Sequence, residues 1–501
     1  MTHGYIDDEH QMSLIDGGTL RGARRNITSL PDDILREVFD LSVHGFSVVP
    51  EYDTPVQYIL GTVCRRWRDL ALHTPLLWSD IYIPMKEPYD SLAFFERSAP
   101  ALIDVSFSSV WSSDMELHNR VSKAILKNIS RLRKLNIDVL NLDELTSLFV
   151  AWRDKEAPNF RQLNIVCHDT FIGIKELDAT FLSYGESLRS VKLAGLEFNA
   201  LPFLPNLTTL EIDRMRPEPP NLQALFDHCP ALESLTVGQF GAPPPSDDTG
   251  APRVPSTLEI VAPSLKSLAL NLDCDHTEEC GCALPHLVAE NLEYLEISQY
   301  DLTFADLQFS ITSHFRELPR LQKLRIRNHL FSDSDVAFFS SLPKTTNLEI
   351  MGFPNHRDPG AGLSILNMPN FQSIAIDLTA FSISRESDVI KLHNVLQANR
   401  PTLRCPVNIC CDADNETIAF WKSLLGERLI IQPMPLQPGL LDNYLFSCDD
   451  MIDRMSGSTA GEYDEQDYEW DEDEWYDEDG DFDDGSDYFE DEEENEDDIH
   501  I

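Results

Sequence analysis

The phrase LPNLTTLEI at residues 204–212 recurs along the chain in the form Pro-x-Leu-x-x-Leu-x-Ile/Leu/Val. Clear copies are CPALESLTV at 229–237, APSLKSLAL at 262–270, AENLEYLEI at 289–297 and LPRLQKLRI at 318–326. Weaker copies begin at residues 99, 129, 157, 186, 342 and 368. The first apolar positions of successive copies lie 19 to 33 residues apart, a spacing that indicates repeated structural units.

A strand with this phrase points alternate residues into a shared core, and one such strand cannot bury its apolar side alone. The copies must therefore stack, with helices such as 221–229 and 306–315 covering the other side. Their spacing is close to the period of leucine-rich repeats, although the asparagine ladder of regular repeats is largely missing. We expect an irregular α/β solenoid over residues 99–410 with a C-terminal cap at 411–450. An ordinary α/β domain with leucine-rich strands is the alternative.

Solenoids usually bind partners on the face of the sheet that lies opposite the core leucines. The residues expected there are Lys192, Glu211, Thr236, Ala269, Glu296, Arg325 and Glu349, flanked by Tyr294 and Lys323. Their mixed charge indicates no particular ligand class. For each of them a solvated surface position is the expected role.

A different pattern precedes the repeats, with ITSLPDDILREVFDLSV at 27–43 and LGTVCRRWRDLALHTPLLWSDIYI at 60–83. Pro31 suits the first turn of a helix, and the carboxylates of Asp32 and Asp33 suit the positive end of its dipole. An apolar stripe follows, and a second helix is expected from about Ile59 to Pro75. The stripe of the first helix comprises Ile34, Leu35, Val38 and Leu41, widened by Phe39, and the second helix would place Val63, Trp67, Leu70 and Ala71 on one face.

The ordered pairs Leu30-Pro31, Ile34-Leu35 and Val38-Phe39, followed by Val63-Cys64-x-x-Trp67 and Leu77-Trp78, resemble an F-box of the fungal type. The connection at 44–58 is longer than in most F-boxes, and Pro50 and Pro55 mark it as a loop. The resemblance implies a module over 26–83 that docks the Skp-type adaptor, and through it the cullin, of an SCF-type ubiquitin ligase. The docking residues it implies are Leu30, Pro31, Ile34, Leu35, Val38 and Phe39, with Val63, Cys64, Trp67 and Leu70 shared between docking and the module's own core.

The chain has 501 residues and a net charge of −46, so it holds more than one domain and is strongly acidic. Residues 461–501 hold 24 acidic residues and no Lys or Arg. This composition predicts a disordered tail over 451–501, with aromatic residues among the acids that could dock a basic protein. Nucleic acid is not an expected partner because no basic stripe is present.

The N-terminal 25 residues are expected to be a disordered lead, since they lack the basic start and apolar core of a targeting sequence. The sequence contains no run of about eighteen apolar residues, the length that would indicate a membrane span. The ten cysteines are expected to be reduced thiols, and the cytosol or nucleus is the implied compartment. One short segment is dense enough in thiols and imidazoles to hold zinc; its candidate ligands are Cys274, His276, Cys280, Cys282 and His286. We expect a loop of reduced thiols there instead.

No cofactor is expected, and no phosphate-binding loop or nucleophile motif indicates an enzyme. The F-box resemblance then implies a non-catalytic receptor whose helical module docks the adaptor and whose repeats recruit an unknown protein target. An acidic chaperone or scaffold for basic proteins such as histones is the alternative. A catalytic site hidden in the repeats is a third hypothesis, without a residue to name.

Overall fold

We describe the structure from a computed structural model. The described residues are 30–44, 55–83, 91–108, 115–139, 145–146, 149, 152, 155–168, 186–197, 202–215, 219–240, 259–272, 286–299, 318–327, 344–351, 371–377, 405–410, 418–419, 421–423, 426–432 and 439–441. Several predictions lie outside them: the N-terminal lead, most of the loop at 44–58, the helix at 306–315, the cysteine-rich segment at 274–282 and the acidic tail. The chain divides into two units, Met1–Ser447 and Cys448–Ile501, and all described residues belong to the first.

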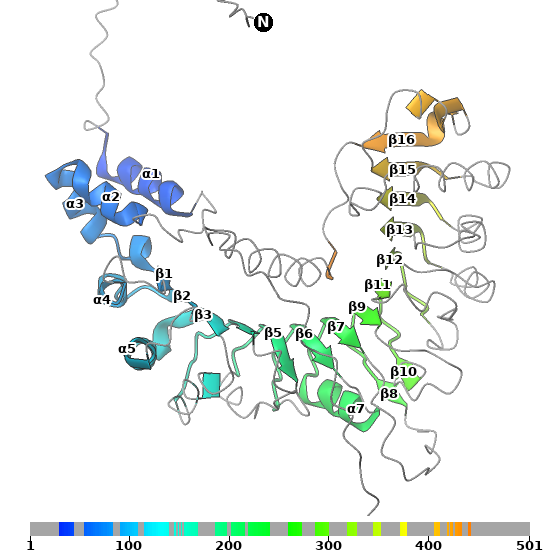
Figure 1. Ribbon diagram of the computed structural model, residues 1–501, viewed down its shortest axis with the longest axis horizontal. Coiled ribbons are helices and arrows are strands. Elements are labelled where there is room, and N and C mark those ends of the chain that lie inside the picture. The colour runs from blue at the N-terminus through cyan, green and yellow to red at the C-terminus, as the bar shows by residue number, and fades with distance from the viewer. Residues whose placement is uncertain are drawn as a thin grey trace, which may run out of the picture. The chain divides into compact units, whose positions relative to one another are not determined.

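A 14-stranded sheet, in which each strand pairs in parallel with its neighbours, runs through the first unit (Figure 1). The strands follow one another in sequence order, so each connection returns the chain to the next position, as in an α/β solenoid. The predicted α/β solenoid is therefore confirmed, and each of the eleven phrases supplies one strand. The strands of this sheet are β1 (Asp80–Ile83), β2 (Ile103–Ser108), β3 (Leu132–Val139), β4 (Gln162–Cys167), β5 (Ser190–Glu197), β6 (Thr209–Met215), β7 (Ser234–Phe240), β9 (Ser267–Leu272), β11 (Tyr294–Gln299), β12 (Lys323–Arg327), β13 (Asn347–Met351), β14 (Ser373–Asp377), β15 (Val407–Cys410) and β16 (Leu429–Gln432).

Where the phrase contains a proline, that residue lies in a tight turn just before the strand, as the copies at 204 and 318 show. The Leu207 amide donates to the Leu204 carbonyl at 3.2 Å, and the Leu321 amide donates to the Leu318 carbonyl at the same distance. Pro205 and Pro319 occupy the second position of these turns, where their fixed φ is favourable. The leucines that follow the turn are fully or almost fully buried in one continuous core. Turn chemistry and apolar burial thus repeat together along the solenoid.

A ladder of side-chain hydrogen bonds connects these turns, at the position just before the first leucine of the phrase. Asn159 donates to the Ser130 carbonyl at 2.7 Å, Asn206 to the Glu186 carbonyl at 2.7 Å, and Asn291 to the Pro263 carbonyl at 2.6 Å. Ser187 and Ser264 make the equivalent bonds to Ala157 and Pro230. The ladder was missed in the sequence because serine and asparagine share it. It satisfies turn carbonyls that would otherwise depend on solvent.

Replacing Asn291 by alanine is expected to lower the free energy of unfolding by about 0.5–1.5 kcal/mol, the usual contribution of one such hydrogen bond. The change removes the bond to the Pro263 carbonyl and the acceptor of Arg320, whose Nη1 lies 2.5 Å from Asn291 Oδ1. Urea unfolding measures the loss. Ala231 holds the same position in another turn, so Ala231→Gly serves as a control that removes no ladder bond.

Helices occupy several of the connections. They are α4 (Ala93–Arg97), α5 (Met115–Lys127) and α7 (Pro219–His228), with the short helices η3 (Ile129–Arg131) and η8 (Gly426–Arg428). The predicted helix at 221–229 corresponds to α7, which contacts β8 (Ile260–Val261). A second sheet pairs β8 with β10 (Leu287–Val288) in parallel. Figure 1 shows α4, α5, α7 and this small sheet on the same side of the strands.

The large sheet extends beyond the predicted range of 99–410 at both ends. Strand β1 lies within the N-terminal module and pairs with β2, and β16 lies within the predicted cap and pairs with β15. These strands lack the leucine phrase, so the repeat pattern did not reveal them. Their buried residues, Ile81 and Ile83 in β1 and Leu429 in β16, nevertheless continue the core.

The N-terminal module contains α1 (Asp32–His44), α2 (Val56–Val63), α3 (Arg65–Leu72) and the short helix η2 (Pro75–Trp78). The prediction of one continuous second helix was wrong, because the chain breaks at Cys64, whose φ of −162° and ψ of 170° are extended. Gly61, Thr62 and Val63 have low helix propensity just before this break. As a consequence Val63 is exposed and does not share a face with Trp67 and Leu70.

Candidate functional site

The N-terminal module has its own core. Leu35 and Phe39 of α1 are fully buried, and Trp67 and Leu70 of α3 are almost fully buried. Phe39 and Trp67 pack edge to face with ring centroids 4.9 Å apart. The resemblance implied Leu35 and Phe39 as docking residues, but their burial means that they pack the module's core. Trp67 and Leu70 were expected to be shared between docking and this core, and their burial places them in the core.

The surface of this module is unusually apolar. Ile34 and Leu41 of α1 are 40% and 62% exposed, and Ile59 and Val63 of α2 are 52% and 51% exposed. Ile34 and Leu41 are seven residues apart and Ile59 and Val63 are four apart, so each pair lies on one side of its helix. Among the predicted docking residues, Pro31 is exposed as well, while Leu30, Val38 and Cys64 are half-buried. Leu41 and Ile59 were not predicted as docking residues.

Arg66 connects the start of α1 to the start of α3. Its Nε and Nη2 donate to Asp32 Oδ1 at 3.0 and 2.6 Å, and Nη2 also donates to the Leu30 carbonyl at 2.5 Å. Because Arg66 follows Val63 by three residues, this connection brings the end of α2 close to the beginning of α1. Ile34 lies in the first turn of α1 and Val63 is the last residue of α2, so both lie near the helix ends that Arg66 connects. Gln57 holds α2 to η2 in the same way, with Nε2 donating to the Leu77 carbonyl at 2.9 Å.

A second site lies on the polar face of the large sheet. The strand registers align Lys192, Glu211, Thr236, Ala269, Glu296, Arg325 and Glu349 in one row across β5 to β13. This is the row predicted from the sequence. The predicted solvation of its members was wrong for the central part, since Thr236, Ala269, Glu296 and Arg325 are at most 1% exposed.

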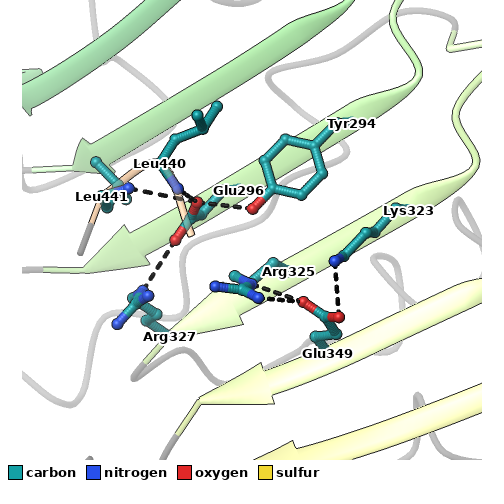
Figure 2. Close-up of polar contacts among 8 residues, drawn as sticks. All are labelled: Tyr294, Glu296, Lys323, Arg325, Arg327, Glu349, Leu440 and Leu441. Carbon is teal, nitrogen blue, oxygen red and sulfur yellow. Dashed lines mark hydrogen bonds and ion pairs between the residues drawn. The ribbon is translucent and has the colours of Figure 1, made fainter. Parts of the chain in front are cut away.

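The buried part of this row contains an ion-pair network, shown in Figure 2. Arg327 Nε lies 3.0 Å from Glu296 Oε1, and Arg325 Nε and Nη2 lie 2.7 and 2.6 Å from Glu349 Oε2. Lys323 Nζ lies 2.7 Å from Glu349 Oε1, and the Tyr294 hydroxyl donates to Glu296 Oε2 at 2.8 Å. Such a network is costly to desolvate, so its members depend on one another. Arg327 was not among the predicted face residues.

Burial and the charges of the network shift the pKa values of two members. Burial raises the pKa of the Tyr294 phenol, and the Glu296 carboxylate raises it further. Burial opposes the charge of Arg325, but Tyr294, Glu349 and Glu296 together outweigh it and raise the pKa of the guanidinium. Tyr294 therefore remains a hydrogen-bond donor and Arg325 a cation throughout the physiological range.

The segment Gly439–Leu441 lies directly on this network, as Figure 2 shows for Leu440 and Leu441. The backbone amides of Leu440 and Leu441 donate to Glu296 Oε2 at 2.7 and 3.4 Å. A Cβ atom on Gly439 would overlap Arg325 Nη1 and both carboxylate oxygens of Glu296. The glycine therefore permits the close approach of the backbone to the ion pairs.

Cys229, at the end of α7, is expected to resist alkylation in the native chain. Burial raises the pKa of its thiol to about 12 from an ordinary value of 9.0, and the reactive species is the thiolate. Iodoacetamide labelling at pH 8, read by mass spectrometry, should modify the half-buried Cys64 well before Cys229. Equal labelling rates for Cys64 and Cys229 would contradict the burial of the Cys229 thiol. Since the folded pKa is the higher one, the stability linked to Cys229 is complete below pH 9 and declines as the pH rises toward 12.

The zinc candidates Cys274, His276, Cys280 and Cys282 lie outside the described residues, and among the described residues no group of His, Cys, Asp and Glu side chains has the arrangement of a metal site. Within the same part of the chain, no helix is long and apolar enough to cross a membrane.

Comparison with known proteins does not assign the chain to a family. Models of known protein families do not match the chain, and neither does any curated protein.

Proposed function

We propose that this chain is the substrate-recognition subunit of an SCF-type ubiquitin ligase. In this proposal the N-terminal module docks a Skp-type adaptor, and through it the cullin, while the solenoid recruits a protein target. The order of the F-box-like residue pairs from Leu30 to Trp78 supports the docking role. The compartment we propose is the cytosol or the nucleus.

The observation that carries the proposal is the apolar surface of the module. Of the ten large apolar side chains that are exposed among the described residues, six belong to the range 30–83. They are Ile34, Leu41, Ile59, Val63, Leu72 and Leu76. A concentration of exposed apolar side chains on so short a segment indicates a surface that is covered by another protein.

The mechanism requires no chemistry from this chain. A receptor that holds a target lysine near the charged ubiquitin carrier raises the effective concentration of the two reactants. The chain's contribution is to join two binding surfaces rigidly enough for this proximity to persist. Strand β1 of the module pairs with β2 of the solenoid, which supports such a connection.

Calorimetric titration of the full chain with purified Skp-type adaptor tests the proposal. We expect 1:1 binding with a dissociation constant below about 1 μM, which corresponds to roughly 8 kcal/mol. A chain that is folded by circular dichroism and does not bind would exclude the receptor role. That outcome would favour an acidic chaperone or scaffold for basic proteins, which a parallel titration with core histones would detect.

A further inference from the structure

The contact between Gly439–Leu441 and the sheet is a peptide-binding geometry formed within one chain. Two consecutive backbone amides, those of Leu440 and Leu441, donate to the same Glu296 oxygen. Glu296 lies 144 residues earlier than Leu440 in the sequence, so the contact is not a local turn. Arg327 and the Tyr294 hydroxyl hold the carboxylate from other directions, which orients it toward the amides.

The side chains of this segment fit the site as closely as its backbone does. Position 439 has no room for a Cβ atom, because that atom would overlap Arg325 and Glu296. Leu440 is half-buried, whereas Leu441 is fully buried. The site therefore accommodates glycine, then a residue with a partly exposed side chain, then leucine. The segment that lies there thus has the pattern Gly-x-Leu.

Polar atoms near this site lack partners. Thr236 is 1% exposed and lies in the same row as Glu296, and Asn271 is 2% exposed and aligns with Ser298 and Arg327. Thr236 Oγ1 and Asn271 Oδ1 have no hydrogen-bond partner among the residues that the structure describes. Buried polar atoms without partners are costly, and a bound peptide backbone is one source of partners for them.

We propose that the Glu296–Arg325–Arg327 site is the target-recognition site of the solenoid, that it binds an extended segment containing Gly-x-Leu, and that Gly439–Leu441 occupies it in the resting chain. This inference rests on the proposed function for its biological role, but the binding it describes does not depend on the adaptor. Only six residues separate Gln432, the end of β16, from Gly439. A tether this short gives the internal segment an effective concentration on the order of millimolar, so it competes strongly with any external peptide.

Fluorescence anisotropy with a labelled peptide of residues 435–443, PLQPGLLDN, tests the proposal on the full chain. The variant Gly439→Ala should displace the internal segment and bind the peptide at least tenfold more tightly than the wild type. Gly61→Ala is the matched control, because a Cβ atom there meets nothing within 4 Å. The same peptide with alanine in place of its glycine should not bind. Equal peptide affinity for Gly439→Ala and Gly61→Ala, or equal affinity for the two peptides, would overturn the proposal.

A measurement on the wild type keeps the test decisive if Gly439→Ala does not fold. Saturating peptide should accelerate hydrogen exchange at the amides of Leu440 and Leu441, since these amides lose Glu296 as their acceptor. Unchanged exchange with bound peptide would place the peptide elsewhere and refute the site. Adaptor titration of the same variant separates the two proposals: peptide binding without adaptor binding would leave this site in place and remove the ligase role.

Discussion

Replacing Glu296 by alanine is expected to lower the free energy of unfolding by about 3–5 kcal/mol, the usual cost of breaking a buried ion pair from one side. Arg327, which is 4% exposed, would lose the Glu296 carboxylate, and the amides of Leu440 and Leu441 would lose the acceptor that Glu296 provides. The Tyr294 hydroxyl would also lose its acceptor. Because each repeat contacts mainly its neighbours, the loss should affect the urea transition that includes β11 to β13.

Glu233→Ala provides the matched control. Glu233 pairs with Lys266 at 2.8 Å, but both side chains are about half exposed, so solvent replaces the interaction when it is removed. We expect no measurable change in the unfolding midpoint for this variant. A Glu296→Ala variant that unfolds at the same urea concentration as Glu233→Ala would show that the buried network does not stabilise the solenoid.

The double variant Ile34→Glu/Val63→Glu is expected to weaken adaptor binding at least 100-fold, or about 3 kcal/mol, without lowering the unfolding midpoint. Both side chains are exposed, so the new carboxylates cost little in the free chain, but docking would bury them without partners. Calorimetry measures the affinity and thermal unfolding confirms the fold.

Two further variants define what this loss means. Phe203→Glu introduces one carboxylate, where the double variant introduces two, at a side chain of the solenoid that is 61% exposed, and it should bind the adaptor like the wild type. Leu35→Ala should instead destabilise the module by about 2–5 kcal/mol, because Leu35 is fully buried. If Phe203→Glu lost affinity as strongly as the double variant, the apolar surface of α1 and α2 would not be the docking site.

The solenoid could be predicted from the sequence because one phrase encodes both a proline turn and an alternating strand. Strands β1, β15 and β16 could not, since Ile81, Val407 and Leu429 continue the core without that phrase. The break at Cys64 was missed because the apolar spacing of α2 and α3 is compatible with one helix. The extended backbone of Cys64 alone separates α2 from α3.

The sequence predicted which residues lie on the polar face of the sheet, but not that the central ones are buried. Alternation along each strand places Glu296 and Arg325 opposite the core leucines, and the register then aligns them. Their burial depends partly on Gly439–Leu441, a segment far away in the sequence whose approach is visible only in three dimensions. The docking residues show the same limit, because helical spacing alone did not distinguish the buried Leu35 from the exposed Ile34.

Hydrogen exchange of the full chain, with and without saturating Skp-type adaptor, tests the central claim most directly. The adaptor should slow exchange in α1 and α2, where Ile34, Leu41, Ile59 and Val63 are exposed, and leave β11 to β13 unchanged. Slower exchange on the polar face of the solenoid, or no change anywhere in the folded chain, would contradict a receptor that docks its ligase through the N-terminal module.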